Sequence, residues 1–114
     1  MDEISSLGET EVYEVKGDAL NNFHLFPDQL GFRKPSLHEL RGGDAAYNAN
    51  VLTEILANRD RGAKRDLITI NAAAALVIAG SAPRMDSGIQ LANEILDSGL
   101  GLEKLREFQR FFSS

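Results

Sequence analysis

The amino-acid sequence predicts an α/β protein in which a β-hairpin near the N-terminus is followed by about four to five helices. Residues 11–26 hold two β-prone segments on either side of a glycine turn. From residue 45 onward, apolar residues recur at helical spacing. Capping residues and glycines separate these later segments, as expected at helix ends. The 114 residues are enough for one small domain with a modest core.

The hairpin is predicted from two short segments. Residues 11–16 favour a strand because Val12, Tyr13 and Val15 have high β propensity. A turn follows at Gly17, and residues 20–26 form the returning strand until Pro27 ends it. A two-stranded hairpin alone is marginally stable in water. We therefore expect the sheet to need strands that this chain does not contain.

The first helical signals lie between residues 36 and 64. Ser36 and Glu39 match a capping box, but the glycine pair 42–43 limits it to one short turn. Asp44 is a favourable N-cap for the next helix. Its apolar face is traced at helical spacing by residues 45, 49, 52 and 56. This helix is expected to end in the polar stretch 58–64.

A third helix is predicted from an N-cap at Asp66 to a C-terminal glycine at Gly80, with Pro83 shortly beyond. Residues 67–78 leave almost no polar face, and a helix that is apolar all round is expected to be buried. This helix is therefore the predicted centre of the core. Asn71 lies within it and is expected to be a buried amide with its hydrogen bonds satisfied.

Two further helices complete the prediction. The fourth runs from about residue 86 or 87 to Leu96, and Gly99 closes it. The fifth starts at about Leu102 and carries apolar residues through the C-terminal segment. Three phenylalanines there, Phe108, Phe111 and Phe112, are interpreted as core or domain interface rather than as a stacking platform.

Composition excludes several classes of function. The net charge of −5 argues against a nucleic-acid partner, because such binding rests on Lys and Arg meeting phosphates. The absence of cysteine excludes disulfides, zinc thiolates and thiol nucleophiles. His24 and His38 have no metal-ligand spacing and are expected at the surface. No signal peptide is visible, and the longest apolar run, 72–80, is too short to span a membrane. A cytoplasmic location is expected.

Two short motifs carry possible chemistry. Asp2 and Glu3 are adjacent carboxylates, and paired acids can hold a hard cation such as Mg²⁺ that prefers oxygen ligands. A glycine pair before a helix, as at Gly42 and Gly43, can bind an anion. Its spacing fits neither a P-loop nor a dinucleotide fingerprint, and Asp44 would repel the anion. Helix capping is therefore the preferred interpretation of the second motif.

Several stretches in order resemble the C-terminal part of the anthranilate phosphoribosyltransferase family, within glycosyltransferase family 3 and its nucleoside phosphorylase-like fold. They are Asp2-Glu3-Ile4-Ser5, Gly8-Glu9-Thr10, Val12-Tyr13-Glu14-Val15, Phe26-Pro27-Asp28 to Leu30-Gly31, Leu40-Arg41-Gly42-Gly43-Asp44-Ala45 with Asn48-Ala49, Asn71-Ala72-Ala73-Ala74-Ala75-Leu76, and Asp97-Ser98-Gly99. The resemblance covers essentially the whole chain. It implies that residues 1–114 are a single partial domain, the C-terminal portion of the family's α/β domain.

The resemblance also implies a reaction. The family enzymes transfer a 5-phosphoribosyl group from phosphoribosyl pyrophosphate to the amine of anthranilate in tryptophan biosynthesis, with Mg²⁺. In that family the Asp-Glu pair matched by Asp2 and Glu3 binds the magnesium associated with the pyrophosphate. A metal held by carboxylates can neutralise the charge that develops on this leaving group. No other site residue is carried over, so no catalytic residue is assigned.

The family's glycine-rich pyrophosphate loop, its Lys-His-Gly-Asn-Arg segment and its N-terminal helical domain have no counterpart in these 114 residues. The chain alone is therefore expected to be inactive, with the missing N-terminal part of the same enzyme as its partner. A homodimer is a further expectation, because exposed strand edges and apolar faces favour association. Two alternatives stay open: a non-catalytic scaffold or interaction module, and a fragment of a pyrimidine nucleoside phosphorylase-like enzyme.

Overall fold

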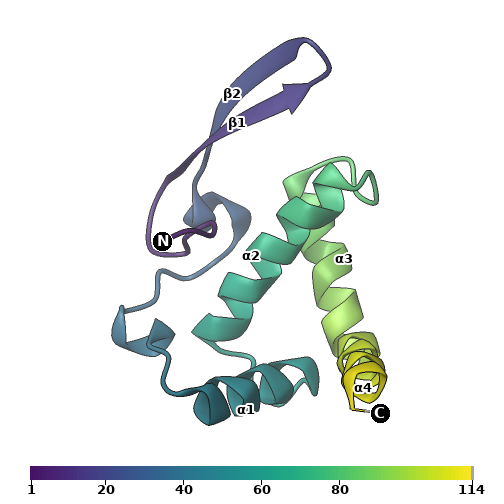
Figure 1. The fold of residues 1–114 in the computed structure, drawn as a ribbon. Coiled ribbons are helices and arrows are strands. Elements are labelled where there is room, and N and C mark those ends of the chain that lie inside the picture. Colours follow the sequence, from purple (N-terminus) through teal and green to yellow (C-terminus); the bar gives the residue numbers. More distant parts are fainter. Residues whose placement is uncertain (114) are drawn as a thin grey trace.

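The computed structural model describes residues 1–113, and it contains a β-hairpin followed by four helices (Figure 1). The strands are β1 (Thr10–Lys16) and β2 (Ala19–Leu25), and the helices are α1 (Ala45–Leu56), α2 (Ala63–Ile78), α3 (Met85–Ser98) and α4 (Leu100–Phe112). Two short 3-10 turns, η1 (Pro27–Leu30) and η2 (His38–Leu40), lie between the hairpin and α1. The predicted order of elements is confirmed.

The hairpin projects away from the helices, and the N-terminus lies at its base (Figure 1). The strands pair antiparallel, with Tyr13 opposite Asn22, and Gly17 takes a positive φ of 60° in the turn that joins them. The second strand begins and ends one residue earlier than predicted, because Phe26 already precedes the η1 turn. Most of β2 is exposed, and only Leu25 is buried. The sheet of the described residues therefore has two strands and little cover.

Several predicted capping residues are confirmed, but α1 ends at Leu56, before the predicted stretch 58–64, and α3 ends at Ser98 rather than at Leu96. Asp44 caps α1 by accepting a 2.8 Å hydrogen bond from the Tyr47 amide. The Ser36–Glu39 capping box is present, with the Glu39 carboxylate accepting from the Ser36 amide at 2.8 Å. Gly80 and Gly99 follow α2 and α3 with φ near 80°.

Three predicted helix starts need correction. Asp66 does not cap α2, because the helix begins three residues earlier at Ala63 with Gly62 as its N-cap. Asp66 lies instead in the first turn, where partial burial raises the pKa of its carboxyl group. Helix α3 starts at Met85, and α4 starts at Leu100, directly after Gly99. Each helix therefore begins one to three residues before the residue from which its start was predicted.

The core lies mainly where α2 packs against α3. Ile55 of α1 and Thr69 and Ile70 of α2 are almost completely buried. Gly88 allows the close approach of α3, since a methyl group there would lie 2.9 Å from the carbonyl oxygen of Ala73. The predicted position of the core within α2 is therefore confirmed for the face of this helix that meets α3.

One prediction of burial is wrong for the described chain, and a second is narrowed. Helix α2 is not buried all round, because Ile78 at its end is 85% exposed. The phenylalanines of α4 were predicted to lie in the core or at a domain interface, and the exposure of Phe111 at 75% excludes the core and leaves the interface. In both places an apolar face extends beyond the helix that packs on it. Apolar patterning predicts that a face is buried somewhere, but it does not say by which polypeptide.

A buried arginine joins α1, α2 and α3. The side chain of Arg65 is only 4% exposed, and its guanidinium donates to Asn58 at 2.7 Å and to Asp97 at 2.8 Å. A third bond reaches Asn93 at 3.2 Å. Asn58 follows α1 and has a positive φ of 62°, a conformation that asparagine tolerates better than most residues. This network fixes the end of α1 against the two longer helices.

The molecule is more open than an independent domain of its size. Its radius of gyration is 15.2 Å, whereas a compact chain of this length is expected near roughly 13 Å. Its accessible surface is 7771 Å², and the size scaling of monomeric proteins gives roughly 6,200 Å². The excess of roughly 1,600 Å² is about twice what one partner buries in a standard protein interface. Exposed apolar side chains on the hairpin, α2 and α4 contribute to this excess.

We expect Gly88→Ala to lower the stability of the chain by about 1 to 3 kcal/mol, because the new methyl group would overlap the backbone of α2. Urea denaturation followed by circular dichroism measures this change. Gly101→Ala is the matched control within a helix, since its methyl group would meet only the flexible end of the Leu56 side chain. A Gly88→Ala chain as stable as the control would contradict the close α2–α3 packing.

The pH dependence of stability tests the arginine network. Hydrogen bonds from Arg65 and then Arg61 lower the pKa of Asp97, so its contribution to stability is full above the unfolded value of about 3.9 and is lost as the pH falls through the lower folded value. We expect Asp97→Asn to be less stable than the parent at pH 6 and to approach it at acidic pH. Urea midpoints at several pH values measure this. A gap that stayed constant across the range would contradict the assignment.

Candidate functional site

The predicted carboxylate pair lies in the irregular segment before β1. Asp2 and Glu3 are both exposed, and neither carboxylate accepts a hydrogen bond from another residue of the described chain, 1–113. The next residue is held firmly, because the Ile4 amide donates to Asn71 Oδ1 at 2.9 Å and the Ile4 carbonyl accepts from Asn71 Nδ2 at 2.9 Å. The two carboxylates are thus free to accept a ligand, while the backbone beside them is fixed to α2.

The pair lines an open hollow at the N-terminal segment. Its lining includes Asp2, Glu3, Ser5, Glu9 and Leu37. Glu9 is the third carboxylate there, but it pairs with the ring of His24. Among residues 1–113, no three acidic or histidine side chains are grouped closely enough to hold a metal on their own. Any cation at this hollow would need ligands beyond the two carboxylates.

The carboxylate oxygens of Asp2 and Glu3 fit a Mg²⁺ ion that also has ligands from outside this chain. Magnesium requires near-octahedral oxygen coordination, keeps several waters, and is commonly bound by one or two carboxylates together with substrate phosphates. Two exposed carboxylates suit such an ion, whereas a closed protein cage would need more ligands from the chain. The residues present therefore fit a metal shared with a phosphorylated ligand.

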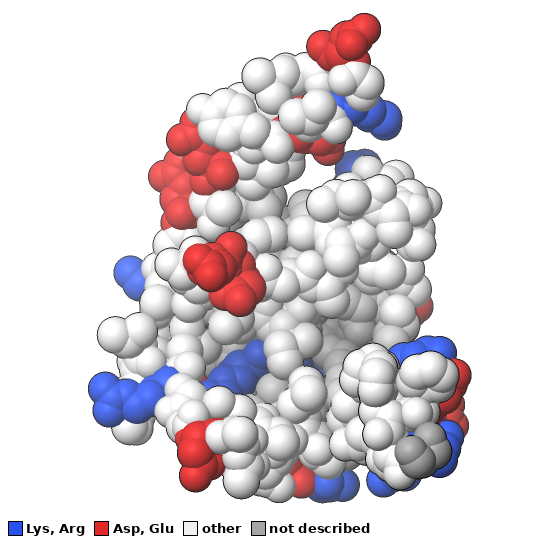
Figure 2. All heavy atoms as spheres, viewed as in Figure 1, with Lys and Arg blue, Asp and Glu red and all other residues white. Residues whose placement is uncertain are grey.

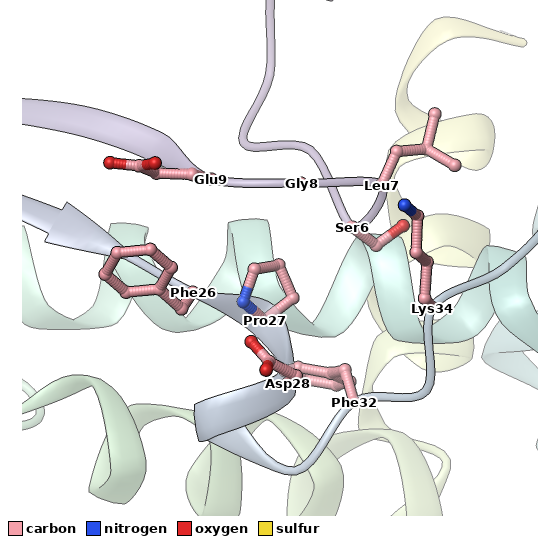
Figure 3. Close-up of a pocket in the computed structure, with 9 residues that line it drawn as sticks. All are labelled: Ser6, Leu7, Gly8, Glu9, Phe26, Pro27, Asp28, Phe32 and Lys34. Atoms are coloured by element: carbon pink, nitrogen blue, oxygen red, sulfur yellow. The ribbon is translucent and has the colours of Figure 1, made fainter.

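A second hollow adjoins the first at the base of the hairpin (Figure 3). Its lining is mostly apolar, from Leu7, Phe26, Pro27 and Phe32, and it also includes Ser6. The Ser6 side chain is buried, and its hydroxyl has no hydrogen-bond partner within the described residues. The hydroxyl of Ser5, by contrast, accepts from the Leu7 amide at 3.0 Å. This hollow lies between the N-terminal segment and the start of η1.

The glycine pair before α1 is a capping element, as predicted. The amide of Gly43 donates to Asn48 Oδ1 at 2.9 Å, and its carbonyl accepts from Asn48 Nδ2 at 3.0 Å. Asp44 already accepts from the Tyr47 amide. An anion at this place would need free backbone amides, but those of Gly43 and Tyr47 already donate to the side chains of Asn48 and Asp44.

Charge is distributed unevenly over the surface. In Figure 2, acidic side chains gather over the hairpin and its base, while most basic side chains lie below the hairpin, among acidic ones. Hydrogen bonds from Tyr13 and Asn22 lower the pKa of Glu11 on the hairpin. The Arg33 guanidinium lowers the pKa of Glu39 to about 2. His24 and His38 are exposed, which confirms the expectation that both lie at the surface.

Comparison with known proteins identifies the family. The sequence model of the "Glycosyl transferase family, a/b domain" matches residues 1–102. The chain belongs to this family. This confirms the family that the ordered motifs indicated.

The similar sequences are anthranilate phosphoribosyltransferases. The chain is 47% identical over 104 residues to the one from Mesorhizobium japonicum, covering 91% of the chain and 31% of that protein. It is 40% identical over 114 residues to the one from Acetivibrio thermocellus, covering 100% of the chain and 33% of that protein. The chain therefore spans about a third of the length of these curated relatives.

Solved structures give the same result. The crystal structure of the Thermus thermophilus enzyme superposes with a TM-score of 0.85 at 30% identity, covering 95% of this chain and 32% of that one. The Saccharomyces cerevisiae enzyme in complex with 4-fluoroanthranilate gives 0.83 at 27% identity, with the same coverage of each chain. A variant of the yeast enzyme with Mg bound gives 0.84, also at 27% identity and with the same coverage. The hairpin and four helices thus match part of the enzyme's α/β domain.

Sequence reasoning missed two features around the site. It predicted that the Asn71 amide is satisfied, but not that its partner is the backbone of Ile4, 67 residues away. It also gave no role to Arg65. The available signals were a single amide in an otherwise apolar helical stretch and an arginine at a position that the helical spacing places inside.

No helix within residues 1–113 has the length and apolar content needed to cross a bilayer.

The buried hydroxyl of Ser6 gives a test of this segment. We expect Ser6→Ala to leave the stability of the chain unchanged or slightly higher, because it removes a buried polar group that lacks a partner. Ser5→Ala is the matched control and should lose about 1 kcal/mol with its bond to the Leu7 amide. Thermal denaturation measures both. A clear loss of stability in Ser6→Ala would show that its hydroxyl has a partner.

Proposed function

We propose that this chain acts as the C-terminal third of an anthranilate phosphoribosyltransferase. The observation that carries the proposal is the match of nearly the whole chain to one contiguous third of these enzymes, in both sequence and structure. In such an enzyme, the 5-phosphoribosyl group passes from phosphoribosyl pyrophosphate to the amine of anthranilate. The bond from ribose C1 to the pyrophosphate oxygen breaks and its electron pair leaves with the pyrophosphate, while a bond from C1 to the amine nitrogen forms and that nitrogen releases one proton.

In this proposal Asp2 and Glu3 bind the Mg²⁺ that accompanies the pyrophosphate. Both side chains are exposed in the hollow at the N-terminal segment, and their oxygens are the ligands that magnesium prefers. When bound, the ion offsets the negative charge that the leaving pyrophosphate gains. The acidic pair would otherwise repel a pyrophosphate, so the carboxylates and the anion need the cation between them.

The partner in this proposal is a polypeptide equivalent to the preceding two thirds of the relatives. The excess accessible surface and the exposed apolar faces of the hairpin and α4 support it, because an independent domain of this size would bury more of them. That polypeptide would supply the remaining substrate contacts and further strands for the sheet. We expect the chain alone to form no phosphoribosyl anthranilate, and homodimerisation through the same faces to be a weaker competing association.

A fusion enzyme tests the proposed role of the carboxylates. This chain replaces the matching third of the Acetivibrio thermocellus enzyme, and the loss of anthranilate fluorescence reports turnover. We expect Asp2→Ala together with Glu3→Ala to reduce turnover by about a hundredfold or more, since it removes the ligands of the ion that stabilises the leaving group. Glu14→Ala with Asp18→Ala, at the turn end of the hairpin, changes the net charge equally and should retain activity.

Two results would contradict the proposal. Unchanged turnover and unchanged magnesium dependence in the doubly substituted fusion would remove the carboxylates from the site. Formation of phosphoribosyl anthranilate by the unfused chain would show that a partner polypeptide is not required.

A further inference from the structure

The side chain of Asn71 makes three hydrogen bonds that join α2 to the N-terminal segment. Its Oδ1 accepts from the Ile4 amide, and its Nδ2 donates to the Ile4 carbonyl, each at 2.9 Å. The same Nδ2 also donates to the Leu67 carbonyl one turn earlier in α2, at 2.9 Å. Both protons and the oxygen of the amide are therefore used. Few side chains could replace it, because the site needs one acceptor and two donors in a plane.

The two bonds to Ile4 fix more than one residue. The Ile4 amide belongs to the peptide plane that runs from the Cα of Glu3 to the Cα of Ile4, and a peptide plane moves as a rigid unit. The Ile4 carbonyl begins the next plane. Holding both groups therefore sets the direction in which the backbone leaves Ile4 toward Glu3 and Asp2. Without this restraint, three residues at the start of an irregular segment would be expected to fray.

The other end of the restraint is rigid. The bond to Leu67 fixes the rotamer of Asn71 against its own helix. Helix α2 is in turn held by its close contact with α3 at Gly88 and by the guanidinium network of Arg65. The carboxylate pair is thus connected, through one amide, to the most buried helix of the chain.

We propose that Asn71 is a positioning residue for the magnesium site, holding the Asp2–Glu3 segment in the orientation that binds the ion. This inference rests on the proposed function, because it requires that these carboxylates bind the metal. Asn71 itself does not touch the ion. Groups that orient metal ligands commonly change metal affinity by about 10 to 100-fold when they are removed.

Hydrogen exchange on the parent chain gives the first test, without any substitution. We expect the Ile4 amide to exchange slowly although it lies outside any strand or helix, and the amides of Asp2 and Glu3 to exchange rapidly. Rapid exchange at Ile4 would overturn the inference at once, because the bond on which it depends would not persist in solution.

The second test uses the fusion enzyme with Asn71→Leu, which keeps the approximate size and removes all three bonds. We expect the magnesium concentration at half-maximal activity to rise about 10 to 100-fold, with much of the turnover recovered at saturating Mg²⁺. Direct titration with Mn²⁺ and pyrophosphate should show the same loss of affinity. Thr69→Ala is the control, since it removes a buried hydrogen bond within the same helix without touching Ile4.

The outcomes separate the inference from the proposed function. A normal metal affinity in Asn71→Leu, with a weakened affinity in the Asp2→Ala and Glu3→Ala variant, would leave the metal site intact and overturn the role of Asn71. Normal affinity in both would refute the metal site itself, and the inference with it. Equal loss in Asn71→Leu and Thr69→Ala would show a general loss of stability and would also overturn the role.

Discussion

The amide of Asn71 connects the two parts of this molecule. Within residues 1–113, no other side-chain hydrogen bond joins the first 30 residues to the four helices. The hairpin has little contact with the helices, although Val15 of β1 and Ile78 of α2 line a common hollow (Figure 1). The amide of Asn71 is therefore the main polar connection between the N-terminal segment and α2. Asn71 is half-buried rather than fully buried as the sequence predicted, but its amide oxygen and both of its amide protons are hydrogen-bonded. A shift of the segment would break these bonds, so they favour one arrangement.

This constraint also explains how an exposed and irregular segment can contribute to a site. Metal ligands must be held in place before the ion arrives if they are to bind it tightly. Asp2 and Glu3 are too exposed to be fixed by packing around them. Their order must come from the adjacent backbone, and that backbone is hydrogen-bonded to the helix that contains the core. Asn71 therefore links the helical core to the proposed metal-binding segment.

The sequence predicted the local elements well because their signals are local. Asp44, Gly80, Gly99 and the Ser36–Glu39 pair each mark a helix end through bonds to nearby residues or through backbone conformation. The start of α2 was misplaced because Gly62, a weak signal, caps it in place of Asp66. The partner of Asn71 and the network of Arg65 could not be predicted, since they join residues that only the tertiary structure brings together. Residue chemistry singled out Asp2 and Glu3 as possible cation ligands, and the resemblance then implied their role at the pyrophosphate.

Some helix faces that the apolar sequence pattern predicts to be buried are exposed in this structure. Ile78 and the phenylalanines of α4 follow helical spacing that predicts burial, and all of them are exposed. A pattern of this kind, together with a surface larger than the size of the chain predicts, is consistent with a piece of a larger assembly. The similarity to one third of each relative, in sequence and in structure, agrees with that interpretation.

A crystal structure of the fusion enzyme with Mn²⁺ and pyrophosphate would test the central claim most directly, because the anomalous signal of manganese locates the ion. The account predicts an ion coordinated by the carboxylates of Asp2 and Glu3 and by pyrophosphate oxygens, with the Asn71–Ile4 hydrogen bonds intact. An ion bound to pyrophosphate without either carboxylate would contradict it.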